Sequence, residues 1–120
     1  MEDGAVLGRL FEKITHADQL GDILTIFEAI RKPRTSAIVK GSLACQKLYH
    51  LHDGSIQKER DRQLLEEEPF EGYPFRWKDP WFQKSIYGYN AFEEADRGWQ
   101  KYMSGQFPLT SDAWRHQKSD

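Results

Sequence analysis

A proline inside an amphipathic run is the feature that most constrains how this chain can fold. The run extends from Leu20 to Thr35 and reads LGDILTIFEAIRKPRT. Its apolar residues recur at steps of three and four positions, which places them on one helix face: Leu20, Ile23, Leu24, Phe27 and Ile30. Proline disfavours helical geometry in the preceding residue but is tolerated in the first turn of a helix. We therefore expect a helix, a sharp corner at Arg31-Lys32, and a new helix that starts at Pro33.

Polar residues mark both ends of the first of these two helices. Asp18 stands where its side-chain oxygen can cap the free amides of the first turn. Arg31 and Arg34 lie on either side of the corner, and we expect them to fasten it to neighbouring structure. The helix from Pro33 should run to about Leu51. Its apolar stripe is weak and is interrupted by Gly41; the stripe consists of Ile38, Cys45, Leu48 and Tyr49.

Four other segments follow helical patterns. They are Glu2 to Ile14, Ser55 to Glu68, Trp81 to Tyr87, and the stretch from Asn90 to about Met103. Asp79-Pro80 is typical of a helix start, with the aspartate as cap and the proline in the first turn. Asn90 caps the last helix, and Glu93 stands where it can complete a capping box. The pattern predicts a mainly α chain.

The middle of the chain is charged and then irregular. Mixed charges three and four positions apart from Ser55 to Glu68 predict a solvated helix or a mobile loop rather than an interaction site. Its few core positions are Ile56, Leu64 and Leu65. From Pro69 to Pro80, three prolines and Gly72 exclude a regular element.

Gly4 and Gly8 lie four positions apart on one side of the first helix. They have two interpretations. In the first, they simply allow another backbone to come close. In the second, this helix packs tightly on a sheet or a cofactor layer. The residues alone leave both open.

Composition limits the class of protein. The chain has 120 residues and a net charge of −2, which allows one modest domain and no strong field for nucleic acid or an anionic membrane. No apolar run approaches the roughly 18 residues of a membrane helix. The N-terminus is acidic, unlike a secretory signal, and Cys45 is the lone cysteine, so we expect a cytoplasmic protein. Because the first helix lacks a cap and a lead-in, we also expect an incomplete domain.

The stretch from Phe70 to Tyr102 is dense in aromatic residues. These are Phe70, Tyr73, Phe75, Trp77, Trp81, Phe82, Tyr87, Tyr89, Phe92, Trp99 and Tyr102. Such side chains seldom stay in water without a partner surface. We expect some of them to pack on protein outside this chain or on a second subunit. Residues 105–120 are mostly polar and are expected to form a disordered tail.

No set of residues has the pattern of a reactive site. His50 and His52 could both ligate a metal from a strand, but their place at a helix end favours a polar turn. His16 and His116 are isolated, and Cys45 fits a small core residue better than an activated thiolate. The chain lacks the glycine-rich phosphate loops and the G-x-S-x-G elbow. Consecutive carboxylates at 66–68 point different ways on a helix and form no acid–base pair.

Two segments carry a resemblance to a known family. EDGAVLGRLF, from Glu2 to Phe11, resembles a helix of FAD-dependent aromatic-ring monooxygenases of the salicylate-hydroxylase-like type common in fungi. FEAIRKPRT, from Phe27 to Thr35, resembles the Arg-x-Pro-Arg pattern that ends the next helix in that family. Further matches occur at QKERD, from Gln57 to Asp61, and between Tyr73 and Tyr89, where the pattern resembles the family's C-terminal tail at Trp77, Asp79-Pro80, Phe82-Gln83 and Tyr87-Gly88-Tyr89. The resemblance covers roughly residues 1 to 99.

The resemblance implies the C-terminal helical region of an α/β flavin monooxygenase, over residues 1–104. Complete members use FAD, NAD(P)H and dioxygen to hydroxylate aromatic or polyketide-like substrates. In them FAD is held by a G-x-G-x-x-G unit and by a Gly-Asp segment just before the first helix seen here. This chain contains neither, and the substrate-domain sheet is missing. We therefore carry over no catalytic, flavin-binding or metal-ligating residue, and Glu2 and Asp3 are interpreted as structural.

Two hypotheses from different classes follow. In the first, the chain is a C-terminal portion of a flavin monooxygenase that neither binds FAD tightly nor hydroxylates a substrate on its own. In the second, it is a non-catalytic interaction module that docks on a flavoprotein body or a full-length paralogue. A free-standing small catalyst has the least support. The substrate and the oligomeric state stay open.

Overall fold

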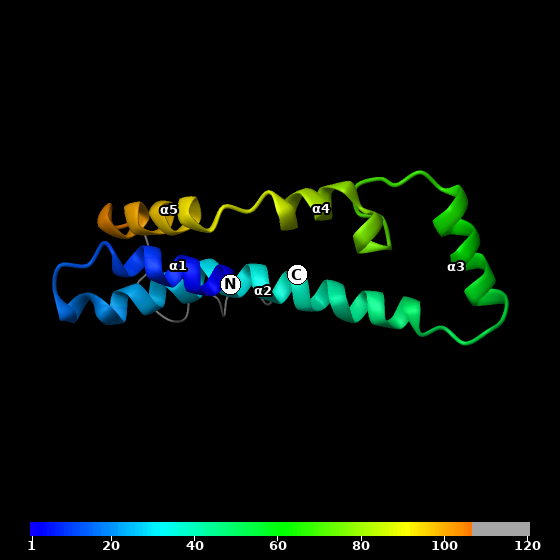
Figure 1. The fold of residues 1–120 in the computed structure, drawn as a ribbon, viewed down its shortest axis with the longest axis horizontal. Coiled ribbons are helices and arrows are strands. Elements are labelled where there is room, and N and C mark those ends of the chain that lie inside the picture. Colours follow the sequence, from blue (N-terminus) through cyan, green and yellow to red (C-terminus); the bar gives the residue numbers. More distant parts are fainter. Residues whose placement is uncertain (107–120) are drawn as a thin grey trace. The chain divides into compact units, whose positions relative to one another are not determined.

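The computed structural model describes residues 1–106 and shows five α-helices, two 3-10 turns and no strand among them (Figure 1). They are α1 (Glu2–Phe11), η1 (Ala17–Gln19), α2 (Leu20–Tyr49), α3 (Ser55–Glu66), η2 (Arg76–Lys78), α4 (Pro80–Tyr87) and α5 (Ala91–Met103). The predicted mainly α fold is confirmed. The expected disordered tail lies outside the described residues from 107 onward.

The predicted corner at Pro33 is wrong. Helix α2 is 30 residues long and continues through Pro33 without a break. It ends at Tyr49, two residues before the expected end. An internal proline removes one backbone hydrogen bond and crowds the preceding turn. Tertiary contacts override this local cost, because Arg31 and Arg34, one on each side of the proline, are both held by carboxylates of α1.

Two of the three predicted helix starts have the expected caps. Asp79 accepts hydrogen bonds from the amides of Trp81 and Phe82 at the start of α4, with Pro80 in its first turn. Asn90 does the same for Phe92 and Glu93 at the start of α5. Before α2, Asp18 lies within η1. There the Gln19 side chain instead accepts from the amides of Thr15 and His16, at 2.9 and 3.2 Å.

The chain divides into two compact units, and the division falls within α2. The first comprises Met1–Thr35 and the chain from Asn90 onward. Its core consists of fully buried side chains from α1, α2 and α5: Val6, Leu10, Ile23, Ile26 and Ala95. Burying each of the larger ones contributes about 1.5–3 kcal/mol.

The core face of α2 differs from the predicted stripe. Ile23 is buried as expected, but Leu20 and Leu24 remain 43% and 48% exposed. Ile26, which the stripe omitted, is fully buried. The reason is that α2 packs on α5 as well as α1, so its core face turns toward Ile26. At the α5 contact, a Cβ added to Gly98 would lie 2.6 Å from a methyl of Ile30.

The second unit, Ser36–Tyr89, has a smaller buried set. It consists of Cys45, Tyr73, Phe75, Asp79 and Gly41. Cys45 is 4% exposed, as expected for a small core residue. Gly41 does not merely interrupt a stripe, because a Cβ there would lie 3.3 Å from the ring of Phe82. The missing side chain lets α4 approach α2.

Helix α3 contributes little to either core. It forms as predicted, and Arg62 bridges Glu59 and Glu66 along its exposed face. Ile56 and Leu65 were expected to be core positions, but they are 71% and 86% exposed. Both predictions are wrong, because neither side chain is packed into a core of the described residues.

Candidate functional site

Two arginines of α2 and two carboxylates of α1 form a four-residue ionic contact in the first unit. We call Glu2, Asp3, Arg31 and Arg34 the arginine–carboxylate cluster. Arg34 donates to both carboxylate oxygens of Glu2 at 2.8 and 2.7 Å, a bidentate arrangement. Arg31 lies 2.9 Å from Glu2 and also donates to Asp3. The cluster therefore ties the start of α1 to the middle of α2.

Burial is uneven across the cluster. The side chains of Arg31 and Arg34 are only 7% and 12% exposed, whereas that of Glu2 is 39% exposed. Hydrogen bonds from Arg34 and then Arg31 lower the pKa of Glu2 from 4.5 to about 2, although burial opposes them. The carboxylate is thus ionised at any physiological pH. The predicted fastening role of the two arginines is confirmed, although the helix they fasten has no corner.

A second ionic contact joins α1 to α5. Asp96 receives hydrogen bonds from Arg9, and Lys13 lies 2.6 Å from the same carboxylate. Arg9 and then Lys13 lower the pKa of Asp96 from 3.8 to about 2. On the same helix, the Tyr102 hydroxyl donates to Asp22 of α2 at 2.5 Å. These contacts hold helices together and leave no reactive group poised toward a cavity.

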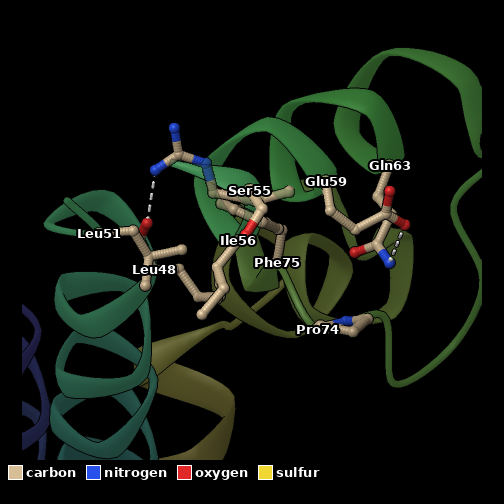
Figure 2. Close-up of a pocket in the computed structure, with 9 residues that line it drawn as sticks. Leu48, Leu51, Ser55, Ile56, Glu59, Gln63, Pro74 and Phe75 are labelled. Atoms are coloured by element: carbon tan, nitrogen blue, oxygen red, sulfur yellow. Dashed lines mark hydrogen bonds between the residues drawn. The ribbon is translucent and has the colours of Figure 1, made fainter. Parts of the chain in front are cut away.

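The second unit contains an open groove of about 410 Å³ (Figure 2). It is lined by the end of α2, one face of α3 and an irregular segment: Leu48, Leu51, Ser55, Ile56, Glu59, Arg60, Gln63, Pro74 and Phe75. Arg60 does not face the groove as a free cation, because it donates to the carbonyl of Leu48 at 2.6 Å and pairs with Asp61. The Gln63 side chain donates to Glu59 at 3.2 Å.

The groove lacks the features of a proton-transfer site. A general base works best with a pKa near the operating pH. Glu59 departs from that requirement, because Arg62 lowers the pKa of its carboxyl below the ordinary value. No second carboxylate and no histidine lines the groove with it. The lining is mostly apolar, so the groove can bind an apolar group but offers no acid–base pair.

The residues weighed as candidates from the sequence are dispersed. His50 and His52 are exposed around the end of α2, His16 precedes η1, and Cys45 is buried inside the second unit. His116 lies outside the described residues. Over residues 1–106, no three His, Cys, Asp or Glu side chains gather as metal ligands would. In the same range, no helix combines the length and apolarity needed to cross a bilayer.

The sequence did not predict how charged side chains bind the carbonyls at the ends of α2 and α3. Arg60 reaches back to the last turn of α2, and Lys78 of η2 donates to the carbonyls of Leu64 and Glu67 at 2.7 Å each. It also missed that Glu2 and Asp3 are the partners of Arg31 and Arg34. A signal for that pairing was present, because two acidic residues open one predicted helix and two arginines lie in the next.

Comparison with known proteins shows what this chain is similar to. No family model matches the chain. Over 97 residues, 80% of its length, the chain is 39% identical to the FAD-dependent monooxygenase OpS4 of Beauveria bassiana (strain ARSEF 2860). The resemblance to part of an FAD-dependent monooxygenase is confirmed. The chain spans 23% of that relative, which is consistent with a C-terminal portion of such an enzyme.

The arginine–carboxylate cluster joins the two segments on which the resemblance rests. Glu2 and Asp3 belong to EDGAVLGRLF, and Arg31 and Arg34 belong to FEAIRKPRT. Residues that are 28 to 32 positions apart in sequence are thus direct ionic partners. The two motifs therefore contact each other directly within this chain.

Three helix starts of the described part, those of α1, α4 and α5, do not suit the pyrophosphate of FAD. A pyrophosphate is held by a glycine turn and the free amides of a helix start. The start of α1 carries Glu2 and Asp3, whose negative charges repel phosphate, and their arginine partners are engaged. The starts of α4 and α5 are closed by Asp79 and Asn90. We therefore assign no step of flavin chemistry to residues of this chain.

Proposed function

We propose that this chain is a helical portion of an FAD- and NAD(P)H-dependent monooxygenase and that it supplies structure rather than chemistry. The observation that supports it most directly is the arginine–carboxylate cluster, in which the two motifs of the resemblance bind each other. A tie of this kind orients α1 on α2. In a complete enzyme the flavin would supply the oxygen chemistry.

The proposal extends to the setting of such an enzyme. By its resemblance, the complete protein would hydroxylate aromatic or polyketide-like substrates in secondary metabolism, in the cytoplasm. The groove of the second unit is apolar and open, but its residues present no pair of groups for proton transfer. The chain alone is therefore expected to have no hydroxylase activity.

An activity assay on the purified chain tests this proposal. The chain is incubated with FAD, NADH or NADPH, and a panel of phenolic acids, with complete OpS4 run in parallel as a flavoprotein control. We expect the chain to give no flavin-dependent oxidation of the nicotinamide and no hydroxylated product above a protein-free blank. Turnover by the chain that rises in proportion to its concentration would overturn the proposal.

A docking module is the second candidate function. It is favoured by one observation: several large apolar side chains of the second unit are about half exposed or more, among them Trp77, Trp81 and Tyr87. This function does not compete with the first, because a portion of an enzyme must contact the remainder.

A further inference from the structure

The exposed aromatic side chains are distributed unevenly between the two units. In the second unit they are Tyr49, Phe70, Trp77, Trp81 and Tyr87. In the described part of the first unit they are Phe11 and Phe92. The first unit also has the larger fully buried core and the two ionic ties. The second unit therefore has the greater need for a covering surface.

Two of these aromatic rings are exposed yet fixed in position. Trp77 is 47% exposed and packs edge-on against Phe82, with ring centroids 5.9 Å apart. Its carbonyl accepts a hydrogen bond from the Gln83 side chain. Trp81 is 55% exposed, with the Lys84 ammonium 5.5 Å from its ring centroid. Rings already held in place lose little freedom when a partner covers them.

Cations flank the two rings. Arg76 lies over the Phe82 ring at 5.8 Å, beside Trp77, and Lys84 lies beside Trp81. We call Arg76, Trp77, Trp81 and Lys84 the tryptophan surface; it is formed by η2 and α4. Tryptophan and arginine are the residues most enriched at the centres of protein interfaces. A matching partner would present an apolar depression with carboxylates at its rim.

We propose that the tryptophan surface docks on the flavin-binding body of an FAD-dependent monooxygenase similar to OpS4. The chain spans 23% of that relative, so more than three quarters of such a polypeptide lies outside the part seen here. The rest of a polypeptide similar to OpS4 is therefore the partner that the sequence match identifies. This inference rests on the proposed function and specifies which surface of the chain meets the rest of the enzyme.

Co-purification tests the proposal. OpS4 shortened by the segment that matches this chain is co-expressed with the tagged chain, and the complex is analysed by size exclusion and by its FAD content. We expect a one-to-one complex. The double variant Trp77→Ser with Trp81→Ser should weaken it by at least about tenfold, as the loss of two central anchors does.

A matched double variant controls for lost apolar area. Val39→Ser with Leu65→Ser removes two residues that are more exposed than the tryptophans but lie on α2 and α3, outside the tryptophan surface and the groove, and it should change binding by less than about twofold. Far-UV circular dichroism checks folding. Lys84→Glu supplies a variant that leaves both rings in place, and it should weaken binding more at low salt than at high salt.

Three outcomes would overturn the proposal. They are a wild-type chain that fails to bind or solubilise the shortened OpS4, a folded tryptophan variant that binds as well as wild type, and a tryptophan surface that forms a dimer of this chain instead. None of these depends on the activity assay. Turnover by the isolated chain would overturn the proposed function and leave the docking result readable.

Discussion

Glu2 accepts from two arginines that lie one helical turn apart on α2, and both arginine side chains are far less exposed than the carboxylate. The two arginine side chains are almost completely buried, so their carboxylate partners must compensate for the hydration that each guanidinium has lost. By contrast, Arg62 on α3 is 45% exposed with Glu59 and Glu66 as partners. Water can replace those partners at little cost. The number of ion pairs around an arginine is therefore a poor guide to its contribution.

Replacing Arg31 is expected to cost more than replacing Arg62. Arg31→Met leaves Asp3 without its arginine and Glu2 with Arg34 alone, and should lower the free energy of unfolding by about 2–3 kcal/mol. The matched change Arg62→Met should lower it by less than about 1 kcal/mol. Urea unfolding followed by circular dichroism measures both. Equal losses in the two variants would show that burial does not set the strength of the cluster.

Stability should fall on acidification through a defined window. The pKa of Glu2 is about 2 in the folded chain against an ordinary value of 4.5. A lowered pKa adds stability that is fully present above the unfolded value and is lost as pH falls through the folded value. We expect a plateau above about pH 5 and a decline from about pH 4.5 to pH 2, with a smaller share from Asp96.

The variant Glu2→Gln isolates the contribution of Glu2 to that decline. It should be less stable than wild type at neutral pH and should lose less stability between about pH 4.5 and pH 2. The remaining loss belongs to Asp96 and other carboxylates. Urea midpoints measured across that range provide the comparison. Parallel pH profiles for the two proteins would mean that Glu2 is not stabilised by its arginines.

Among the helices, α2 is the one whose local sequence opposes its structure. Pro33 lies inside the helix, where proline costs about 3 kcal/mol relative to alanine. Its ring is exposed, so no packing is lost when it is replaced. Pro33→Ala should therefore raise the free energy of unfolding by about 1–3 kcal/mol.

Ser36 is also exposed in α2 and provides the control. Ser36→Ala should change the free energy of unfolding by less than about 0.5 kcal/mol. Urea unfolding of both variants is the measurement, and a Pro33 variant no more stable than wild type would favour the corner over the continuous helix.

Two glycines test how closely the helices approach. A Cβ at Gly8 of α1 meets nothing within 4 Å, whereas one at Gly98 of α5 would lie 2.6 Å from Ile30 and 3.0 Å from Ile26. Gly8→Ala should stabilise the chain by about 0.5–1 kcal/mol through helix propensity. Gly98→Ala should gain nothing or lose stability, because Ile30 and Ile26 must shift.

Thermal unfolding of the two alanine variants makes the comparison, since both changes are identical in chemistry and both lie inside helices. We expect their melting temperatures to move in different directions or by clearly different amounts. Equal stabilisation would mean that α5 does not approach α2 as closely as described. The result also bears on Gly4 and Gly8, whose predicted close contacts are not made by the described residues.

Over the whole chain, the sequence predicted local events better than long-range ones. The caps at Asp79 and Asn90 and the helices that follow them are predicted from nearby residues, and all four are confirmed. The errors at Pro33, Leu20, Leu24, Ile56 and Leu65 share a different cause. Each depends on which other element packs against the helix, and periodicity within one helix carries no information about its partners.

The pairing of Glu2 with Arg31 and Arg34 shows the same limit. The opposite charges in the sequence allowed the two segments to pair. Which carboxylate pairs with which arginine depends on how α1 packs against α2. The resemblance had identified the two segments as a joint signature without saying why they occur together. Their direct contact supplies a physical reason, because the carboxylates of the first segment neutralise the arginines that are buried in the second.

Titration of the isolated chain with FAD tests the central claim most directly, namely that this chain provides structure and not a flavin site. Flavin fluorescence is followed as protein is added, with apo-OpS4 as the positive control. We expect saturable quenching by apo-OpS4 and none by the chain. Saturable quenching by the chain at a one-to-one ratio would contradict it.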